Sequence, residues 1–179
     1  MRRSIGAGLA LGFFVAAGGA FAQAPEPRQR VDAGRFYSGR WHEIARRPMW
    51  ITDGCVAGAT DYGRGRRGEI TILDSCREGH PNGAWKTIGG PGTILDPGVN
   101  AKLRVDYTLY GLIPIRRDYW VIERAPDYSW FISADPTFRD LYIFTRSHRV
   151  SPAQVRRLVG RARALGYDVR QLEFPEQPR

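Results

Sequence analysis

The chain has few residues of the kinds that build metal centres. Its 179 residues include two cysteines and three histidines. Neither clustered Cys and His residues nor a His-Glu-x-x-His run is present, although zinc sites require such spacing. The sequence therefore predicts no metal site and no cofactor.

Motifs of catalysis and of phosphate binding are missing as well. The chain contains no G-x-S-x-G run and no glycine-rich phosphate loop. The glycine-rich run at 89–92 (GGPG) falls inside a strand pattern, where it is more typical of a bulge or a bend. No pair of carboxylates stands out by its spacing. We therefore predict that the protein is not an enzyme.

The first 22 residues have the pattern of a secretory signal peptide. Two arginines precede an apolar run from Ile5 to Ala17, and small residues lead to Ala20-Phe21-Ala22. This is an A-x-A cleavage pattern, so we expect cleavage after Ala22. A retained membrane anchor is less favoured, because the run is short and interrupted by glycine. The mature chain is expected to be soluble, in the periplasm or outside the cell.

Export also bears on the two cysteines. An oxidising compartment favours a disulfide bond between Cys55 and Cys76 over two free thiols. Closing a loop of this length would stabilise the fold by roughly 3 kcal/mol in the chain-entropy account. A nucleophilic cysteine would need an unpaired thiol and is the weaker alternative.

The chain is basic, with a formal net charge of +9. Two of these charges, Arg2 and Arg3, would leave with the signal peptide. The remaining arginines are scattered and form neither a basic tail nor a nucleic-acid motif. We interpret them mainly as a solvated surface, with contact to anionic membranes as the alternative, and we predict no nucleic-acid partner.

After a polar lead-in at 23–30, interpreted as flexible, the chain alternates between short strand patterns and turns. Eight strands are predicted, at 40–47, 55–62, 69–76, 85–94, 101–109, 118–124, 128–134 and 140–146. Eight consecutive antiparallel strands favour a closed up-and-down barrel, because closure leaves no free edge. The predicted fold is therefore all-β, with one barrel domain at 31–174 and a tail at 175–179.

One α-helix is predicted after the strands. Ser151 offers an N-cap, Pro152 suits the first helical position, and Gln154 completes a capping-box pattern. Apolar residues then follow at helical spacing: Val155, Leu158, Val159, Ala162 and Leu165. Gly166 is expected to end the helix. Its apolar stripe should pack against the outside of the barrel.

Four stretches carry a resemblance to a known family. They are the segment 31–37, the triplet GRW at 39–41, DYWVI at 118–122, and LYIFTR at 141–146. In this order and spacing they resemble the short N-terminal helix, the G-x-W signature, the strand after the central crossing and the late arginine signature of lipocalins. The bacterial branch of that family is the most similar. The resemblance runs from about residue 31 to 174 and implies an eight-stranded barrel with room for a ligand.

The resemblance implies that two of these motifs close one end of the barrel. Trp41 is expected to point inward as a plug, with Arg146 lying across its ring. Such a cation–π contact contributes roughly 0.5–2 kcal/mol. Gly39 would leave space where the N-terminal helix crosses the closed end. All three residues are therefore predicted to be structural.

Strand alternation predicts which residues line the interior. Counting from Trp41 gives Glu43 and Ala45, and counting back from Arg146 gives Phe144 and Tyr142. For the middle strands, the sequence alone does not decide which of the two faces points into the barrel. There the resemblance favours Leu103, Val105, Tyr107, Tyr119, Val121, Ser129 and Phe131. These residues either line an apolar cavity or fill a solid core. If Glu43 is buried, it needs a partner or a raised pKa.

By resemblance we expect a carrier of small hydrophobic molecules, with fatty acids or lysophospholipids as the cargo. Burying an acyl chain would supply roughly 0.8 kcal/mol per CH₂ group. Two alternatives belong to other classes. One is an isomerase- or cyclase-type enzyme on the same barrel, and the other is an interaction protein of the envelope surface.

Overall fold

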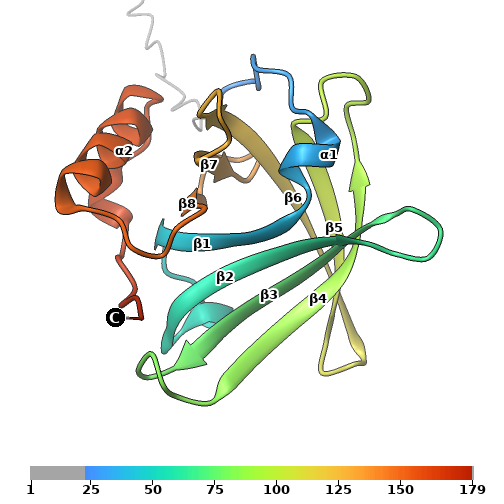
Figure 1. Cartoon of the computed structure of the whole chain (residues 1–179), viewed down its shortest axis with the longest axis horizontal. Coiled ribbons are helices and arrows are strands. Elements are labelled where there is room, and N and C mark those ends of the chain that lie inside the picture. Colours follow the sequence, from blue (N-terminus) through green and yellow to red (C-terminus); the bar gives the residue numbers. More distant parts are fainter. Residues whose placement is uncertain (1–22, 179) are drawn as a thin grey trace, which may run out of the picture.

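The computed structural model describes residues 23–178, so the predicted signal peptide lies outside the described residues. Eight antiparallel strands pair in sequence order, and the last pairs with the first to close the barrel (Figure 1). They are β1 (Gly39–Arg46), β2 (Cys55–Arg64), β3 (Ile70–Glu78), β4 (Trp85–Ile94), β5 (Lys102–Leu109), β6 (Ile113–Arg124), β7 (Trp130–Ala134) and β8 (Leu141–Thr145). The predicted fold class is confirmed.

Most predicted strand limits agree with the structure within two residues, and β6 is the exception. It begins at Ile113, five residues before its predicted start at Asp118. Its first residues continue the hairpin with β5, where Leu109 pairs with Ile113 and Thr108 with Pro114. A proline lacks an N–H donor and weakens the strand pattern, which is why the sequence did not predict this extension.

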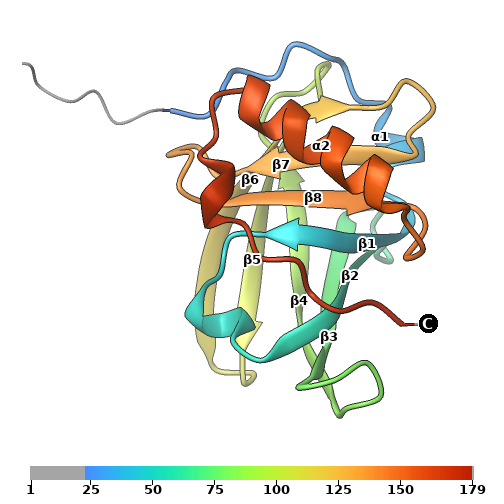
Figure 2. The same ribbon diagram turned by 90° about the vertical axis from the view of Figure 1, so that its left-hand side faces the viewer.

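The helices cap and flank the barrel. α1 (Ala33–Phe36) is a single turn at one end, and Asp32 accepts hydrogen bonds from its first N–H groups. α2 (Pro152–Ala164) lies along the outside of the barrel across β7 and β8 (Figure 2). Two 3-10 turns complete the fold, η1 (Trp50–Thr52) and η2 (Val169–Gln171). No helix in residues 23–178 is long and apolar enough to cross a bilayer.

The predicted N-cap of α2 and its packing against the outside of the barrel are confirmed. The Ser151 hydroxyl accepts a hydrogen bond from the Gln154 N–H at 3.2 Å, and Pro152 opens the helix. Leu158 and Ala162 are fully buried. They pack in an outer core between α2 and the barrel wall, together with Ala45, Ile122, Trp130, Ile132, Ala134, Leu141 and Ile143.

The disulfide bond between Cys55 and Cys76 is present. It joins the first residue of β2 to the third residue from the end of β3, at the end of the barrel away from α1. The two strands are already neighbours in the sheet. The bond therefore fixes the register of this pair at the end of the barrel that α1 does not cover.

A β-bulge in β1 changes which side chains face inward. Glu43 lies opposite Phe144 of β8, and the next paired residues are Ala45 and Ile143, so β1 has one extra residue. An extra residue reverses the alternation beyond it. Ala45 therefore packs in the outer core rather than in the interior, which corrects its prediction as a lining residue. Arg46 turns inward in its place.

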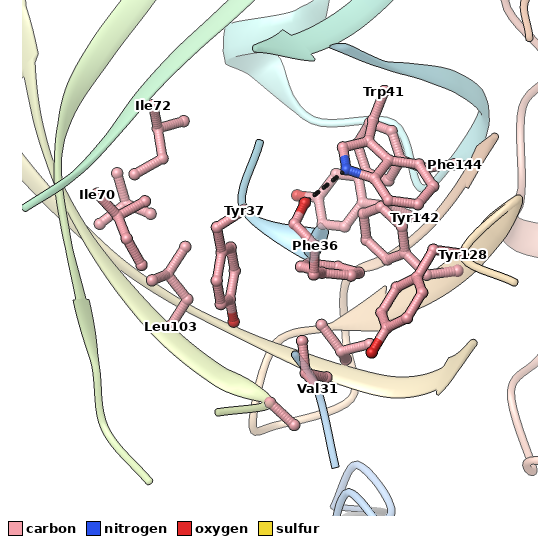
Figure 3. Close-up of a cluster of buried hydrophobic side chains, with 14 of the residues drawn as sticks. Val31, Phe36, Tyr37, Trp41, Ile70, Ile72, Leu103, Tyr128, Tyr142 and Phe144 are labelled. Atoms are coloured by element: carbon pink, nitrogen blue, oxygen red, sulfur yellow. Dashed lines mark hydrogen bonds between the residues drawn. The ribbon is translucent and has the colours of Figure 1, made fainter. Parts of the chain in front are cut away.

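The closed end of the barrel is a solid aromatic core (Figure 3). Trp41 is fully buried, and its indole Nε1 donates a hydrogen bond to the Phe36 carbonyl at 3.1 Å. The rings of Phe36 and Phe131 lie 5.3 and 4.7 Å from the Trp41 ring, centroid to centroid. Arg146 covers the ring from outside, with its Cζ 3.6 Å from the centroid. The predicted plug and its cation–π contact are thus present.

Arg146 also ties α1 to the barrel. Its guanidinium donates hydrogen bonds to the carbonyls of Arg35, Ser38 and Arg40 at 2.8–3.1 Å. Gly39 lies in the same turn with a φ of 62°, a left-handed conformation that favours glycine. A Cβ there would be 3.7 Å from an Arg146 nitrogen, which is ordinary contact. Backbone conformation, more than space, is therefore what requires glycine at this position.

Both ends of the described chain lie against the barrel. In the predicted lead-in, the Ala24 N–H donates to the Pro136 carbonyl at 3.2 Å, and Ala24 is buried. In the predicted tail, the Glu176 carbonyl accepts a hydrogen bond from the Ala57 N–H at 2.8 Å. The Gln177 side chain donates to the Glu43 carbonyl. Residues 23–30 and 175–178 therefore contribute contacts to the barrel.

Truncation of the plug tests how much of the stability depends on this closed end. We expect Trp41→Ala to lower the free energy of unfolding by ~3–5 kcal/mol, because a buried aromatic side chain leaves a cavity. Arg146→Ala should cost less, and the double variant should cost less than the two single losses added together, because the side chains are in contact. Urea denaturation measures all three.

Trp85→Ala is the matched control, because this tryptophan also lies under an arginine, Arg77, but is 53% exposed. We expect its loss to remain well below that of Trp41→Ala. Equal losses at the two tryptophans, or strictly additive losses at Trp41 and Arg146, would contradict this account of the closed end.

Candidate functional site: the barrel cavity

A cavity of about 580 Å³ occupies the barrel beyond the aromatic plug. This volume lies in the range of sites for one small ligand, about 300–1,000 Å³. All eight strands contribute to its wall, and its rim includes η1 and the β5–β6 turn. Figure 2 shows these two segments at the same end of the barrel, away from α1. The interior is therefore a cup with one closed and one open end.

Most of the predicted lining residues face this cavity. They are Glu43, Val105, Tyr107, Tyr119, Phe131, Tyr142 and Phe144. Val105, Phe131 and Phe144 also belong to the buried core at the closed end, so they form the floor of the cup. The sequence left open whether these residues line a cavity or fill a core, and here they do both.

Three further predicted lining residues lie outside the cavity wall, besides Ala45. Leu103 and Val121 do point inward, but they are packed into the solid core around Trp41. Ser129 precedes β7, and its carbonyl accepts a hydrogen bond from the Arg146 N–H at 2.9 Å. Strand alternation gives the direction of a side chain but not its depth in the barrel, so it could not separate these residues from the cavity.

Aromatic rings form one side of the cavity. The rings of Phe131 and Phe144 are stacked with centroids 4.9 Å apart, and Tyr142 continues this row at 6.3 Å from Phe144. Tyr119 meets Tyr142 edge to face at 5.8 Å. These four residues lie on β6, β7 and β8, so the wall combines a large apolar surface with two hydroxyl groups.

The inward Glu43 has its partner in Arg46. The Arg46 Nη1 donates to a Glu43 oxygen at 2.5 Å, and its Nε donates to a Glu173 oxygen at 2.6 Å. The remaining nitrogen donates to the carbonyls of Thr52 and Cys55 at 3.2 and 2.7 Å. Burial raises the pKa of Glu43, and the Arg46 charge partly offsets that rise. This network also holds the C-terminal segment against β1.

A second carboxylate, Asp74, faces the cavity from the middle of β3. The Thr60 hydroxyl donates to one of its oxygens at 2.5 Å, and the Tyr107 hydroxyl donates to the other at 2.6 Å. The Tyr119 hydroxyl lies 3.3 Å from that of Tyr107. Burial raises the pKa of Asp74, while the two hydrogen bonds oppose the rise. Asp74 and its hydroxyl donors form the polar centre of the cup.

The sequence analysis did not identify Asp74, Arg46 or Arg117 as interior residues. Arg117 lies near the rim, where it donates to an Asp140 oxygen at 2.5 Å. For Asp74 a signal exists, because it continues the alternation of Ile70 and Ile72, which face inward. A charged residue on the apolar face of a strand can thus be recognised from the sequence as a candidate interior residue. Arg46 was not identified because the bulge in β1 reverses the alternation before it. Arg117 was not identified because it lies in the part of β6 that the sequence did not predict.

Within residues 23–178, no three His, Cys, Asp or Glu side chains are grouped as metal ligands would be. His42 faces outward, as its strand position predicts, and its ring lies 5.4 Å from that of His148. Burial, followed by the nearby His148 and Arg40, lowers the pKa of His42. The polar chemistry of the cavity comes from carboxylates, arginines, Lys86 and the hydroxyl groups of tyrosines and Thr60.

Comparison with known proteins identifies the family of this barrel. The model of a lipocalin-like domain matches residues 31–177. The chain belongs to the lipocalin family. Temperature-induced lipocalin-1 of Arabidopsis thaliana is 32% identical over 147 residues, which cover 79% of this chain and 77% of the relative. The family predicted from the GRW and LYIFTR motifs is thereby confirmed.

Solved lipocalin-type barrels share the fold. Insecticyanin from the tobacco hornworm Manduca sexta superposes with a TM-score of 0.66 at 17% identity, over 86% of this chain and 84% of that chain. The tryptamine complex of the amine binding protein of Rhodnius prolixus gives a TM-score of 0.60 at 14% identity, over 86% of each chain. At such identities the likeness concerns the fold.

Removal of Arg46 tests the buried network. We expect Arg46→Ala to lower the free energy of unfolding by ~3–5 kcal/mol, because it leaves Glu43 buried without its cation. The double variant Glu43→Gln/Arg46→Met should recover part of this loss, since neither charge is then buried. Arg40→Ala is the matched control. Its side chain is 48% exposed and pairs with Asp61 at the surface, and such pairs contribute only ~0–1 kcal/mol. Equal losses for Arg46→Ala and Arg40→Ala in urea denaturation would refute the network's role.

Proposed function

We propose that this lipocalin binds and carries small hydrophobic molecules in its barrel, with fatty acids or lysophospholipids as the cargo. The observation that carries the proposal is the cup itself. A plugged floor, an aromatic wall and an open rim enclose about 580 Å³. Such a shape removes an acyl chain from water at roughly 0.8 kcal/mol per CH₂ group. The tryptamine complex of the Rhodnius protein supports a ligand-binding use of this fold.

We propose a binding protein rather than an enzyme of the isomerase or cyclase type. Two of the carboxylates that line the cavity are held in ion pairs, Glu43 with Arg46 and Asp140 with Arg117. A catalytic acid or base needs a pKa near the working pH and access to the substrate. Carboxylates fixed by arginines at about 2.5 Å serve ligand positioning better than proton transfer.

We place the mature protein in the periplasm or outside the cell, following cleavage after Ala22, and on the bacterial branch of the family. The pattern at residues 1–22 supports export. The disulfide bond between Cys55 and Cys76 supports it independently, because such bonds persist in oxidising compartments. A carrier in this location would move a hydrophobic molecule through an aqueous space.

The rim suggests where cargo is exchanged, and we propose peripheral contact with anionic membranes. Trp50 of η1 is 73% exposed, and Tyr110 and Leu112 of the β5–β6 turn are 81% and 85% exposed. Arg47, three residues before Trp50, donates to the Arg139 carbonyl and adds positive charge beside η1. Apolar side chains with adjacent cations are typical of surfaces that dock on anionic lipids. Contact between the rim and the membrane surface would then allow the protein to load or release its cargo there.

A chain-length series tests the carrier proposal. We expect single-chain fatty acids to displace a fluorescent fatty-acid probe with affinity that rises about three- to fourfold per added CH₂ until the cavity is filled. Ser133→Phe adds bulk to the cavity wall and should make the rise stop at a shorter chain. Arg157→Glu, on the exposed face of α2, is the control and should leave the series unchanged. Affinity that ignores chain length, or that responds to Arg157 rather than Ser133, would contradict internal binding.

Vesicle sedimentation tests the membrane proposal. We expect the mature protein to bind vesicles of phosphatidylglycerol and phosphatidylcholine, and Leu112→Ser to weaken that binding about tenfold, because one exposed leucine no longer inserts. Leu73→Ser is the matched control, since Leu73 is an exposed residue in the middle of β3, away from the rim. Equal effects of the two changes, or none from either, would argue against docking through the rim.

A further inference from the structure

Asp74 differs from the other carboxylates that line the cavity. Glu43 pairs with Arg46, and Asp140 pairs with Arg117. In the part of the chain that the structure describes, no Lys, Arg or His nitrogen lies within 4.0 Å of the Asp74 carboxylate. Its negative charge is therefore not neutralised by a basic side chain of the barrel.

The contacts that Asp74 does make are neutral. Thr60 and Tyr107 donate one hydroxyl hydrogen bond each, at 2.5 and 2.6 Å. Because the single Tyr107 proton points to Asp74, the 3.3 Å contact between Tyr107 and Tyr119 directs the Tyr119 hydroxyl toward Tyr107. This chain of donors orients the carboxylate as an acceptor. An ionised carboxylate has about four acceptor positions, so these two hydrogen bonds leave capacity for a ligand.

An interior carboxylate without a cation is costly, because low polarity disfavours an isolated charge. The cost is removed when a cation enters the same space. The surroundings suit a cation as well. β3 lies four strands from β7 in the closed barrel, so Asp74 faces the aromatic wall of Phe131, Tyr142 and Phe144 from the opposite side. The faces of aromatic rings attract cations by roughly 0.5–2 kcal/mol.

The order of polarity along the cup gives the orientation of the ligand. Met49, Trp50, Leu109 and Ile115 give the rim an apolar surface, beside the Arg117–Asp140 ion pair. Asp74 lies deeper, at the middle of β3. A molecule with a charged end and an apolar body satisfies both regions when its charged end points inward and its apolar body remains near the rim.

We infer that Asp74 and its hydroxyl donors form a subsite for a cationic nitrogen, so that the cavity selects amines of amphiphilic or aromatic character. The inference rests on the proposed function, since it assumes that ligands enter the barrel. It makes molecules that carry a protonated amine or a quaternary ammonium group the preferred cargo, and fatty acids weaker ligands of the same cavity. It also assigns Asp74 as the residue that determines specificity.

Within the described barrel wall, Lys86 is the lining residue whose positive charge opposes the binding of an amine. It faces the cavity from β4, where its neighbour Ile88 pairs with Asp74 and Lys86 itself pairs with Cys76, nearer the rim. It makes no ion pair within 4.0 Å. A lysine at this diagonal position repels a bound amine and attracts an anion. Its removal should therefore favour amines further.

Three ligands of equal chain length test the subsite: octylamine, octanol and octanoate, measured by calorimetry at neutral pH. We expect octylamine to bind the mature protein about 10- to 100-fold more tightly than octanol, the range for a hydrogen bond to a charged group. Asp74→Asn should abolish that preference and leave octanol affinity unchanged. Lys86→Met should strengthen octylamine binding. Asp106→Asn removes the same charge from the outer wall, where Asp106 pairs with Arg116, and should have no effect.

The outcomes separate this inference from the proposed function. Octanol binding without a preference for octylamine, or an unchanged preference in Asp74→Asn, overturns the subsite but leaves the carrier intact. Binding of none of the three ligands overturns the carrier. A preference for octanoate that is lost in Lys86→Met also overturns the subsite. Should Asp74→Asn fail to fold, as judged by its thermal transition, Lys86→Met still decides between the amine and the anion.

Discussion

The contact between the Arg146 guanidinium and the Trp41 indole closes one end of the barrel, and the shape of the cavity depends on this closure. The guanidinium lies 3.6 Å from the ring centroid and donates to carbonyls of α1 and of the turn before β1. The indole is thereby fixed at one end, where Phe36 and Phe131 pack on it. Because this end is solid, the remaining interior is a cup with one opening. A cup with a single opening can hold a ligand, whereas a fully packed barrel could not.

The polar groups inside the cup show that its interior is more than an apolar container. The network of Glu43, Arg46 and Glu173 satisfies its own charges and holds the C-terminal segment. Asp74 is different, because hydroxyl groups orient it and no basic side chain within residues 23–178 forms an ion pair with it. Buried charged groups that have no ion-pair partner lower the stability of a fold, and such groups are concentrated at functional sites. The same cavity thus combines a large apolar surface with the one carboxylate that we infer to discriminate among ligands.

The sequence predicted the fold better than it predicted the cavity. Strand patterns, the capping box at Ser151 and the paired GRW and LYIFTR motifs depend on local periodicity and on short signatures, so they gave the barrel, α2 and the plug. Ala45 was assigned to the wrong face because a bulge is a tertiary feature that reverses alternation. Leu103 and Val121 were assigned the right face but not the right depth. Ion pairs such as that of Glu43 with Arg46 depend on the same bulge, and no periodicity could reveal them.

The most direct test of an open, ligand-binding interior is native mass spectrometry of the protein purified from the exported fraction of the cells that make it. The account predicts a population at the mass of the mature, disulfide-bonded chain plus one small amphiphilic molecule, which denaturation releases. Added octanol should remain bound under the same conditions, and this sets the sensitivity of the measurement. A chain found only at its own mass, and unable to retain octanol there, would contradict the account.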